Sequence, residues 1–191
     1  MRLILASQSP RRKELMALLR IPFEIRVADI DEIMDTQKLA CDEVARVSRA
    51  KAEAVKRDAD EVVVAADTIV VCDGQILGKP ADEADAERML TMLSGRSHQV
   101  MTGLTVLYAG ECRSCTEITD ITFAKLTPEQ IRAYVATKEP MDKAGAYGIQ
   151  GGAALFAEKI TGDFYNVVGL PMCRLSRILR EIAPELMEET Q

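Results

Sequence analysis

The chain has 191 residues, of which 48% are apolar and 4% aromatic, with no Trp and a formal net charge of −6. This length and apolar content suit one domain, or two closely joined lobes, with a sizeable core. The acidic balance argues against a nucleic-acid polymer as partner, because proteins that follow a phosphate backbone are usually basic. A small anion held in a local basic pocket remains compatible with this charge.

In chain order, the hydrophobic periodicity predicts strand 2–6, helix 10–20, strand 23–28, helix 42–57, a hairpin at 61–80 around Asp73-Gly74, and a helix from Asp82 to about Leu93. Two long paired strands at 99–108 and 112–126, a helix from Thr127 to about Thr137, a glycine-rich segment 143–160 that ends in a strand, and a helix within 169–182 complete the expected order. Residues 127–130 match a capping box. Because the hairpins exclude a purely parallel sheet, we expect an α/β fold with a mixed sheet.

The five cysteines are scattered and odd in number, which argues against a disulfide framework and favours a reducing cytoplasm. Cys112 and Cys115 form a C-x-x-C pair without a second pair or a His pair, so we interpret them as two thiols near a hairpin. No signal peptide opens the chain, and no apolar run approaches the ~20 residues that a membrane helix needs. The sequence therefore predicts a cytoplasmic protein with no membrane partner.

The segment "SQSPRRK" places three cations, Arg11, Arg12 and Lys13, in the first turn of a predicted helix. The helix dipole makes each cation there unfavourable by about 0.3–1 kcal/mol. The segment directly follows a strand, and backbone amides at a helix N-terminus bind phosphates well. We favour an anion site to which the Ser7 and Ser9 hydroxyls contribute; the alternative is a solvated basic helix face.

Two charged residues interrupt apolar patterns. Lys51 lies on the apolar stripe of its helix, where it either points toward a cleft as a phosphate ligand or covers the edge of the core with its stem. Asp67 lies in the apolar run "VVVAADTIVV", which is costly unless the carboxylate is paired, metal-bound or at a cleft. The alternative is two short strands with Asp67 at a bend. A two-residue hairpin turn would place Thr68 opposite Lys79.

Gln150 lies among four glycines within residues 145–152, which allow a close approach of the backbone to a ligand. Its amide offers a donor and an acceptor, which suits reading a base edge, although such segments are usually just turns. The single His, His98, is more typical of a structural role than of a metal centre. Without a convincing nucleophile, the expected chemistry is attack by water, with a carboxylate as base or metal ligand.

The segments "LASQSPRR", "RAKA", "AADTIVVCDGQILGKP", "LSGRSHQVMTG", "DKAGAYGIQGGAALF" and "GDFYNVVGLP" occur in this order. Together they resemble the Maf-like nucleoside triphosphate pyrophosphatases, first described as septum formation inhibitors. The resemblance covers about residues 3–180 and implies a single Maf-like domain over residues 1–191. It further implies an elongated mixed sheet flanked by helices, with two lobes and a central cleft, related to inosine triphosphate pyrophosphatases.

The resemblance implies cleavage of the α–β phosphoanhydride of a nucleoside triphosphate, with a divalent cation, Mg²⁺ or Mn²⁺, as cofactor. It gives Asp67 the role of proton acceptor, and it places Glu32 of "DIDE" in the site through the metal, together with Asp67. The basic residues that it implies as binders of phosphate and substrate are Arg11, Arg12, Lys51 and Lys79.

Three positions resemble those that separate the branches of the family: Arg12, Thr68 and Gln150. The branch that acts on dTTP and UTP carries Arg, Thr and Gln there, whereas the branch acting on 7-methyl-GTP tends to carry Trp, Gln and Glu. The resemblance thus implies a dTTP/UTP pyrophosphatase, with ordinary or modified pyrimidine nucleotides as substrates, and suggests a homodimer. The alternative function is a regulatory protein that binds nucleotide without turnover.

Overall fold

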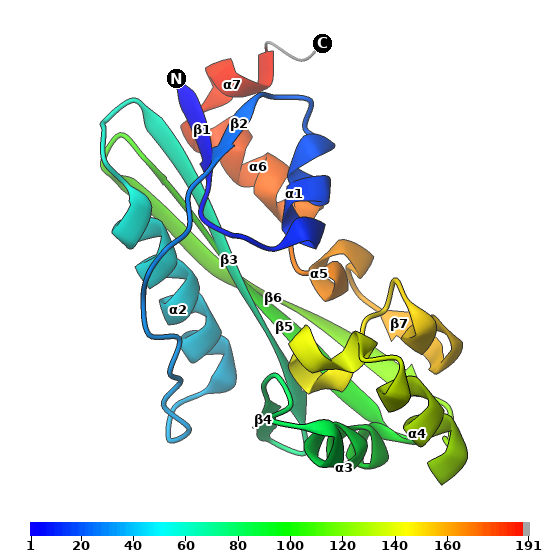
Figure 1. The fold of residues 1–191 in the computed structure, drawn as a ribbon. Coiled ribbons are helices and arrows are strands. Elements are labelled where there is room, and N and C mark those ends of the chain that lie inside the picture. The colour runs from blue at the N-terminus through cyan, green and yellow to red at the C-terminus, as the bar shows by residue number, and fades with distance from the viewer. Residues whose placement is uncertain (189–191) are drawn as a thin grey trace. The chain divides into compact units, whose positions relative to one another are not determined.

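The structure, a computed structural model, describes residues 1–188 and contains one seven-stranded sheet with the strand order β2-β1-β3-β5-β6-β7, to which β4 is added by pairing with β3 (Figure 1). The strands are β1 (Arg2–Leu5), β2 (Phe23–Ile25), β3 (Glu61–Cys72), β4 (Gln75–Leu77), β5 (Ser97–Tyr108), β6 (Glu111–Phe123) and β7 (Ala157–Thr161). β1 runs parallel to β2 and β3, whereas β4 and β7 are antiparallel to their partners. The predicted mixed sheet is confirmed.

The α-helices are α1 (Pro10–Ala17), α2 (Ala40–Val55), α3 (Glu83–Leu93), α4 (Pro128–Ala136), α5 (Phe164–Val168), α6 (Met172–Ile182) and α7 (Pro184–Glu188). Three 3₁₀ turns follow α4: η1 (Glu139–Asp142), η2 (Ala144–Ala146) and η3 (Gly152–Leu155). No helix within residues 1–188 is both long and apolar enough to cross a bilayer.

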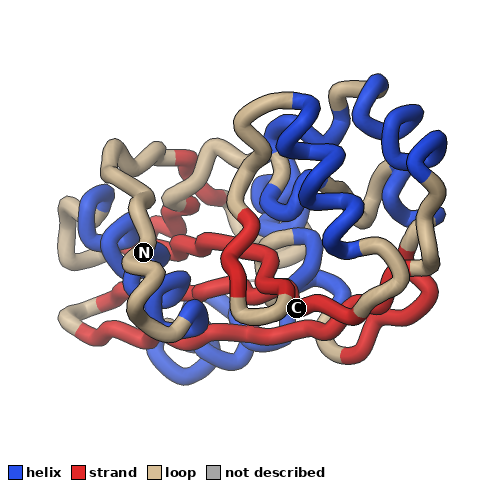
Figure 2. Tube along the Cα trace, turned by 90° about the horizontal axis from the view of Figure 1, so that it is seen from below, coloured by secondary structure: helices blue, strands red, loops and turns tan. Residues whose placement is uncertain are grey.

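The local signals in the sequence placed most of these elements correctly. The capping box at the start of α4 is formed, with Thr127 Oγ1 accepting from the Gln130 amide and Gln130 Oε1 accepting from the Thr127 amide. The β3–β4 hairpin turns at Asp73-Gly74, where φ is +48° and +76°. Two successive positive φ values are typical of a type I′ turn. Figure 2 shows the strands, in red, with their connecting loops.

Some boundaries differ from the expectation. The first helix ends at Ala17 rather than near residue 20, where Arg20 adopts a positive φ of +59° that a helix cannot contain. The strand expected at 23–28 extends only over Phe23–Ile25. The short helices α5 and α7 were not expected, because five residues are too few to show a helical periodicity.

Contacts between residues divide the chain into two compact units. The first contains Met1–Asp67, Thr102–Glu117 and the chain from Gly169 onward, and the second contains Thr68–Met101 and Ile118–Val168. The boundary in β3 thus falls between Asp67 and Thr68. The central cleft between two lobes that the resemblance implies stays a prediction.

In the first unit, α2 covers one side of β1 and β3, while α1 and α6 lie on the other (Figure 1). Side chains of β1, α2 and β3, together with Ala6 just after β1, form a buried cluster of Ile4, Ala6, Ala52, Val55, Val63 and Ala65. On β5, a Cβ added at Gly103 would lie 2.2 Å from the Val44 carbonyl oxygen. The missing side chain therefore lets α2 lie directly against the sheet, which fixes the residues that α2 carries.

The first unit also contains a buried carboxylate at the start of β3, which is paired with an arginine. Glu61, fully buried at the start of β3, accepts hydrogen bonds from Arg26 Nη1 and Nη2 at 3.1 and 3.0 Å. It also accepts from the backbone amide of Arg57 at 2.9 Å. The hydrogen bonds from Arg26 lower the pKa of Glu61 from its ordinary 4.5 to about 2, although burial opposes them.

This lowered pKa makes stability dependent on pH. Because the carboxylate binds protons less readily in the folded than in the unfolded chain, its contribution is complete above about pH 5 and is lost as the pH falls toward 2. We expect Glu61→Gln to flatten the decline of the urea midpoint between pH 6 and pH 3. The control is Glu53→Gln, which removes an exposed carboxylate paired with Arg49. Equal declines in the Glu61→Gln variant and the wild type would contradict the assignment.

Candidate functional site

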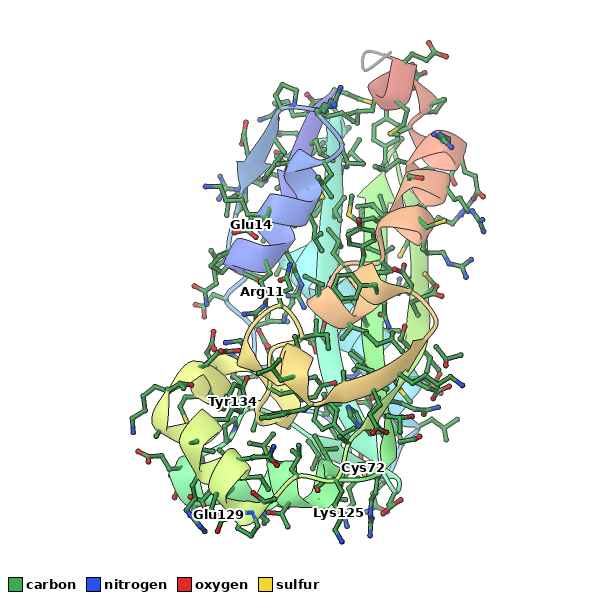
Figure 3. The ribbon with its side chains drawn as sticks, turned by 90° about the vertical axis from the view of Figure 1, so that its right-hand side faces the viewer. Arg11, Glu14, Cys72, Lys125, Glu129 and Tyr134 are labelled. Atoms are coloured by element: carbon green, nitrogen blue, oxygen red, sulfur yellow. The ribbon has the colours of Figure 1, made fainter. Side chains whose placement is uncertain are left out.

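The sequence predicts an anion site at the first turn of α1, and the structure shows which polar groups lie there. Ser9 caps the helix, and its Oγ accepts from the Arg12 amide at 3.5 Å. The buried Ser7 Oγ accepts from the Ser9 amide at 3.2 Å and from Arg12 Nη1 at 3.4 Å. The first turn contains no acidic residue, and Arg11 projects from it (Figure 3). Amides, hydroxyls and guanidinium groups therefore gather at one helix end.

Arg12, in the first turn of α1, interacts electrostatically with two acidic residues of the same unit. Its Nε donates to the Gly169 carbonyl oxygen at 2.8 Å, which fixes the guanidinium. Burial lowers the pKa of Arg12, while the charges of Asp67 and Glu32 raise it. Arg12 thus lies within electrostatic reach of both carboxylates. The sequence did not point to the Gly169 contact, because it joins residues 157 positions apart.

Lys51 forms the centre of this acidic group. Its Nζ donates to Asp67 Oδ1 at 2.7 Å and lies 2.9 Å from Glu32 Oε1. Asp67 is only 7% exposed and lies inside the continuous strand β3, so the alternative of two short strands with a bend is wrong. Lys51 is equally buried. Its ammonium group therefore does not extend into solvent, as it would if only the stem of the side chain covered the edge of the core.

The two carboxylates have the donor chemistry that a divalent cation needs. Asp67 Oδ1 and Glu32 Oε1 both lie within 3 Å of one atom, Lys51 Nζ, so the two oxygens are close to each other. Mg²⁺ is usually bound by one or two carboxylates together with substrate phosphates and water. Within residues 1–188, no group of three or more His, Cys, Asp or Glu side chains forms a metal site by itself. The residues therefore fit a cation that arrives with a phosphorylated substrate.

Three predicted site residues belong to the second unit. Thr68 directly follows Asp67 on β3 and is half-buried. The paired register of the hairpin ends at Val70 and Leu77, so Lys79 lies just beyond β4 and is exposed. Gln150 is exposed in the turn between η2 and η3. The other predicted residues all belong to the first unit: Ser7, Ser9, Arg11, Arg12, Glu32, Lys51 and Asp67.

The glycines around Gln150 lie close to side chains of the same chain. A Cβ added at Gly151 would lie 2.0 Å from Glu139 Oε1, and one at Gly148 would lie 2.7 Å from Lys143 Cε. These glycines therefore make room for side chains of the protein itself, and the close approach of a ligand to them stays a prediction. Nothing in the local sequence singled out Glu139.

The remaining polar candidates have structural positions. His98 is buried and hydrogen-bonded through Nε2 to Tyr147 Oη at 2.8 Å. Burial lowers its pKa to about 4, so the ring is neutral at physiological pH. Cys112 and Cys115 are half-buried free thiols on β6. Burial raises the pKa of Cys115, which makes its thiolate scarce and its sulfur a poor nucleophile.

Comparison with known proteins identifies the family of the chain. The profile of the Maf-like protein family matches residues 2–182. The chain belongs to the Maf-like family. Two relatives, from Bacillus cereus strain AH820 and Bacillus thuringiensis subsp. konkukian strain 97-27, are each 48% identical over 181 residues. The alignments cover 94% of this chain and 95% of those proteins, and both are named dTTP/UTP pyrophosphatase.

Solved structures support the same fold. The Ham1 protein from Coxiella burnetii matches with a TM-score of 0.50 and 17% identity over 95% of this chain and 99% of that one. The Staphylococcus aureus Ham1 protein matches with a TM-score of 0.50 and 13% identity, covering 95% and 98% of the two chains. These likenesses concern the fold, and they agree with the predicted mixed α/β class.

The buried ion pair leads to a test of stability. In Lys51→Met, Asp67 stays buried without its cation, and removing one partner of a buried pair costs about 3–5 kcal/mol. We expect the urea-derived free energy of unfolding to fall by this amount, and Lys51→Met combined with Asp67→Leu to recover most of it. The control is Arg49→Met on the same helix, whose exposed pair with Glu53 is screened by solvent and contributes little to stability. Equal losses in Lys51→Met and Arg49→Met would contradict the buried pair.

Proposed function

We propose that this protein hydrolyses the α–β phosphoanhydride of dTTP and UTP, releasing a nucleoside monophosphate and pyrophosphate. The observation that carries the proposal is the buried Asp67 carboxylate, held by Lys51 and within electrostatic reach of Arg12. The names of the relatives support the same reaction and the same pyrimidine substrates. Modified pyrimidine nucleotides with the same triphosphate are substrates of the same class.

The triphosphate is bound by the N-terminus of α1. Its nearly four negative charges meet the amides of the first turn, the Ser7 and Ser9 hydroxyls and the side chains of Arg11 and Arg12. Each charge-assisted hydrogen bond contributes about 1.5–3 kcal/mol. The cations that are unfavourable for the isolated helix therefore become favourable once the anion is bound. Lys51 and Lys79 act as further binders of the phosphates.

Asp67 orients the attacking water and accepts its proton. Lys51 holds Oδ1 of this carboxylate, which leaves the second oxygen for the water. Asp67 and Glu32 hold the divalent cation, Mg²⁺ or Mn²⁺, which neutralises phosphate charge and polarises the phosphoryl group when bound. Asp67 and Glu32 alone would provide too few ligands for such a cation, so oxygens of the substrate would have to supply the others.

Selection of the base falls to Arg12, Thr68 and Gln150. The Gln150 amide offers a donor and an acceptor, which match the carbonyl and imide groups of thymine or uracil. Thr68 is adjacent to Asp67 on β3, so a base-selecting residue directly follows the catalytic one. We also propose that both units form a single Maf-like domain that acts in the cytoplasm as a homodimer.

An assay of pyrophosphate release tests the reaction. With Mg²⁺ or Mn²⁺, the wild type should turn over dTTP and UTP faster than purine triphosphates. Asp67→Asn should lower kcat by about 10²–10⁴, because general-base catalysis contributes this much, while nucleotide binding by calorimetry stays measurable. The control is Asp58→Asn, which changes an exposed carboxylate paired with Arg2.

The second candidate, a nucleotide-binding regulator of septum formation, predicts a different outcome in the same assay. It requires that the wild type bind dTTP or UTP without releasing pyrophosphate. Comparable turnover in Asp67→Asn and the wild type would instead show that another group accepts the proton.

A further inference from the structure

The turn that carries Gln150 is held at both ends by two side chains. Tyr134 Oη accepts a hydrogen bond from the Gly148 amide at 3.0 Å and donates one to Glu139 Oε1 at 2.9 Å. The second oxygen, Glu139 Oε2, accepts from the Gly152 amide at 3.1 Å. Tyr134 and Glu139 together thus form a clasp that binds the backbone two residues before and two residues after Gln150.

The two side chains of the clasp are held by packing and by backbone contacts. Tyr134 lies on α4 (Figure 3), is only 5% exposed, and packs edge-to-face on Phe156 with ring centroids 5.2 Å apart. Burial raises the pKa of Tyr134, so its hydroxyl keeps the proton that it donates to Glu139. The Glu139 amide donates to Thr137 Oγ1 at 3.2 Å, just after Lys138 turns the chain with a φ of +63°.

The glycines of the turn are explained by this clasp. A Cβ at Gly151 would overlap the Glu139 carboxylate, and one at Gly152 would lie 3.1 Å from the Tyr134 ring. The Gly151 amide donates to the Gly148 carbonyl at 3.0 Å, which closes the turn around Gln150. Gln150 itself remains exposed. The backbone of the turn is therefore held by Tyr134 and Glu139, while Gln150 is exposed to solvent.

We propose that Tyr134 and Glu139 are positioning residues for base selection: by fixing the turn they preorganise the Gln150 amide toward the pyrimidine base. The inference rests on the proposed function, in which Gln150 reads the base. Recognition by hydrogen bonds depends on the placement of the reading group, and a preordered group loses less entropy on binding. Loosening the clasp should therefore weaken discrimination between bases more than it slows the chemical step.

The test compares Tyr134→Phe and Glu139→Gln with the wild type on dTTP and dGTP. We expect the ratio of kcat/KM for dTTP to that for dGTP to fall roughly 3- to 10-fold, the value of one neutral hydrogen bond. The loss should lie in KM for dTTP, with kcat changed less than about 2-fold. The control is Glu129→Gln, which changes an exposed carboxylate in the first turn of the same helix (Figure 3). A merely structural role would lower stability and leave the ratio unchanged.

Two further measurements separate this inference from the proposed function. Hydrogen exchange should show that the Gly148 and Gly152 amides are protected in the wild type and exchange faster in both variants. Calorimetry in an Asp67→Asn background should show the same loss of preference for dTTP over dGTP without turnover. If the wild type binds dTTP selectively but releases no pyrophosphate, hydrolysis is disproved while the loss of binding preference still supports the clasp.

The inference is overturned if the turn amides open in the variants while the dTTP preference is unchanged in both kinetics and binding. It is also overturned if the amides are unprotected in the wild type. Should Tyr134→Phe fail to fold, Glu139→Gln decides alone, because it keeps the size of the side chain while it removes the negative charge and replaces one acceptor oxygen with a donor.

Discussion

The ion pair between Lys51 and Asp67 is the interaction on which the proposed site depends. Burying a carboxylate in a strand is costly unless a partner compensates its charge, and here the partner comes from a neighbouring helix. The close approach of α2 to Gly103 brings that helix against the sheet. The close approach of α2 that buries apolar side chains therefore also places the Lys51 ammonium beside the Asp67 carboxylate. Glu32 and Arg12 then extend the pair into a group of alternating charge.

This arrangement suits an anionic substrate that brings a metal ion. Arg11 and Arg12 oppose the dipole of α1 until a phosphate binds there, so the site is poised for an anion. In the proposed mechanism the two carboxylates would supply only part of the coordination of a divalent cation, so the cation and the triphosphate should each strengthen the binding of the other. In the second unit, the clasp of Tyr134 and Glu139 fixes the turn that carries Gln150, the residue that we propose reads the base.

The sequence predicted features that depend on a few neighbouring residues, such as caps and turns, and charged residues that interrupt an apolar pattern. The capping box at Thr127 and the turn at Asp73-Gly74 are encoded within four residues, and both are formed. Lys51 and Asp67 were noticed because each breaks an apolar pattern. Contacts such as that of Arg12 with Gly169 join distant residues and leave no local signal. The glycines near Gln150 were noticed, but their contact with Glu139 was not predicted, since only the folded chain brings that side chain close to them.

Product analysis tests the central claim most directly. Purified protein, incubated with dTTP and Mg²⁺, is assayed for thymidine monophosphate, thymidine diphosphate, pyrophosphate and orthophosphate over time. The account predicts that monophosphate and pyrophosphate form in equal amounts from the start. Formation of diphosphate with orthophosphate would contradict it, because water would then attack at the wrong anhydride for the assigned reaction.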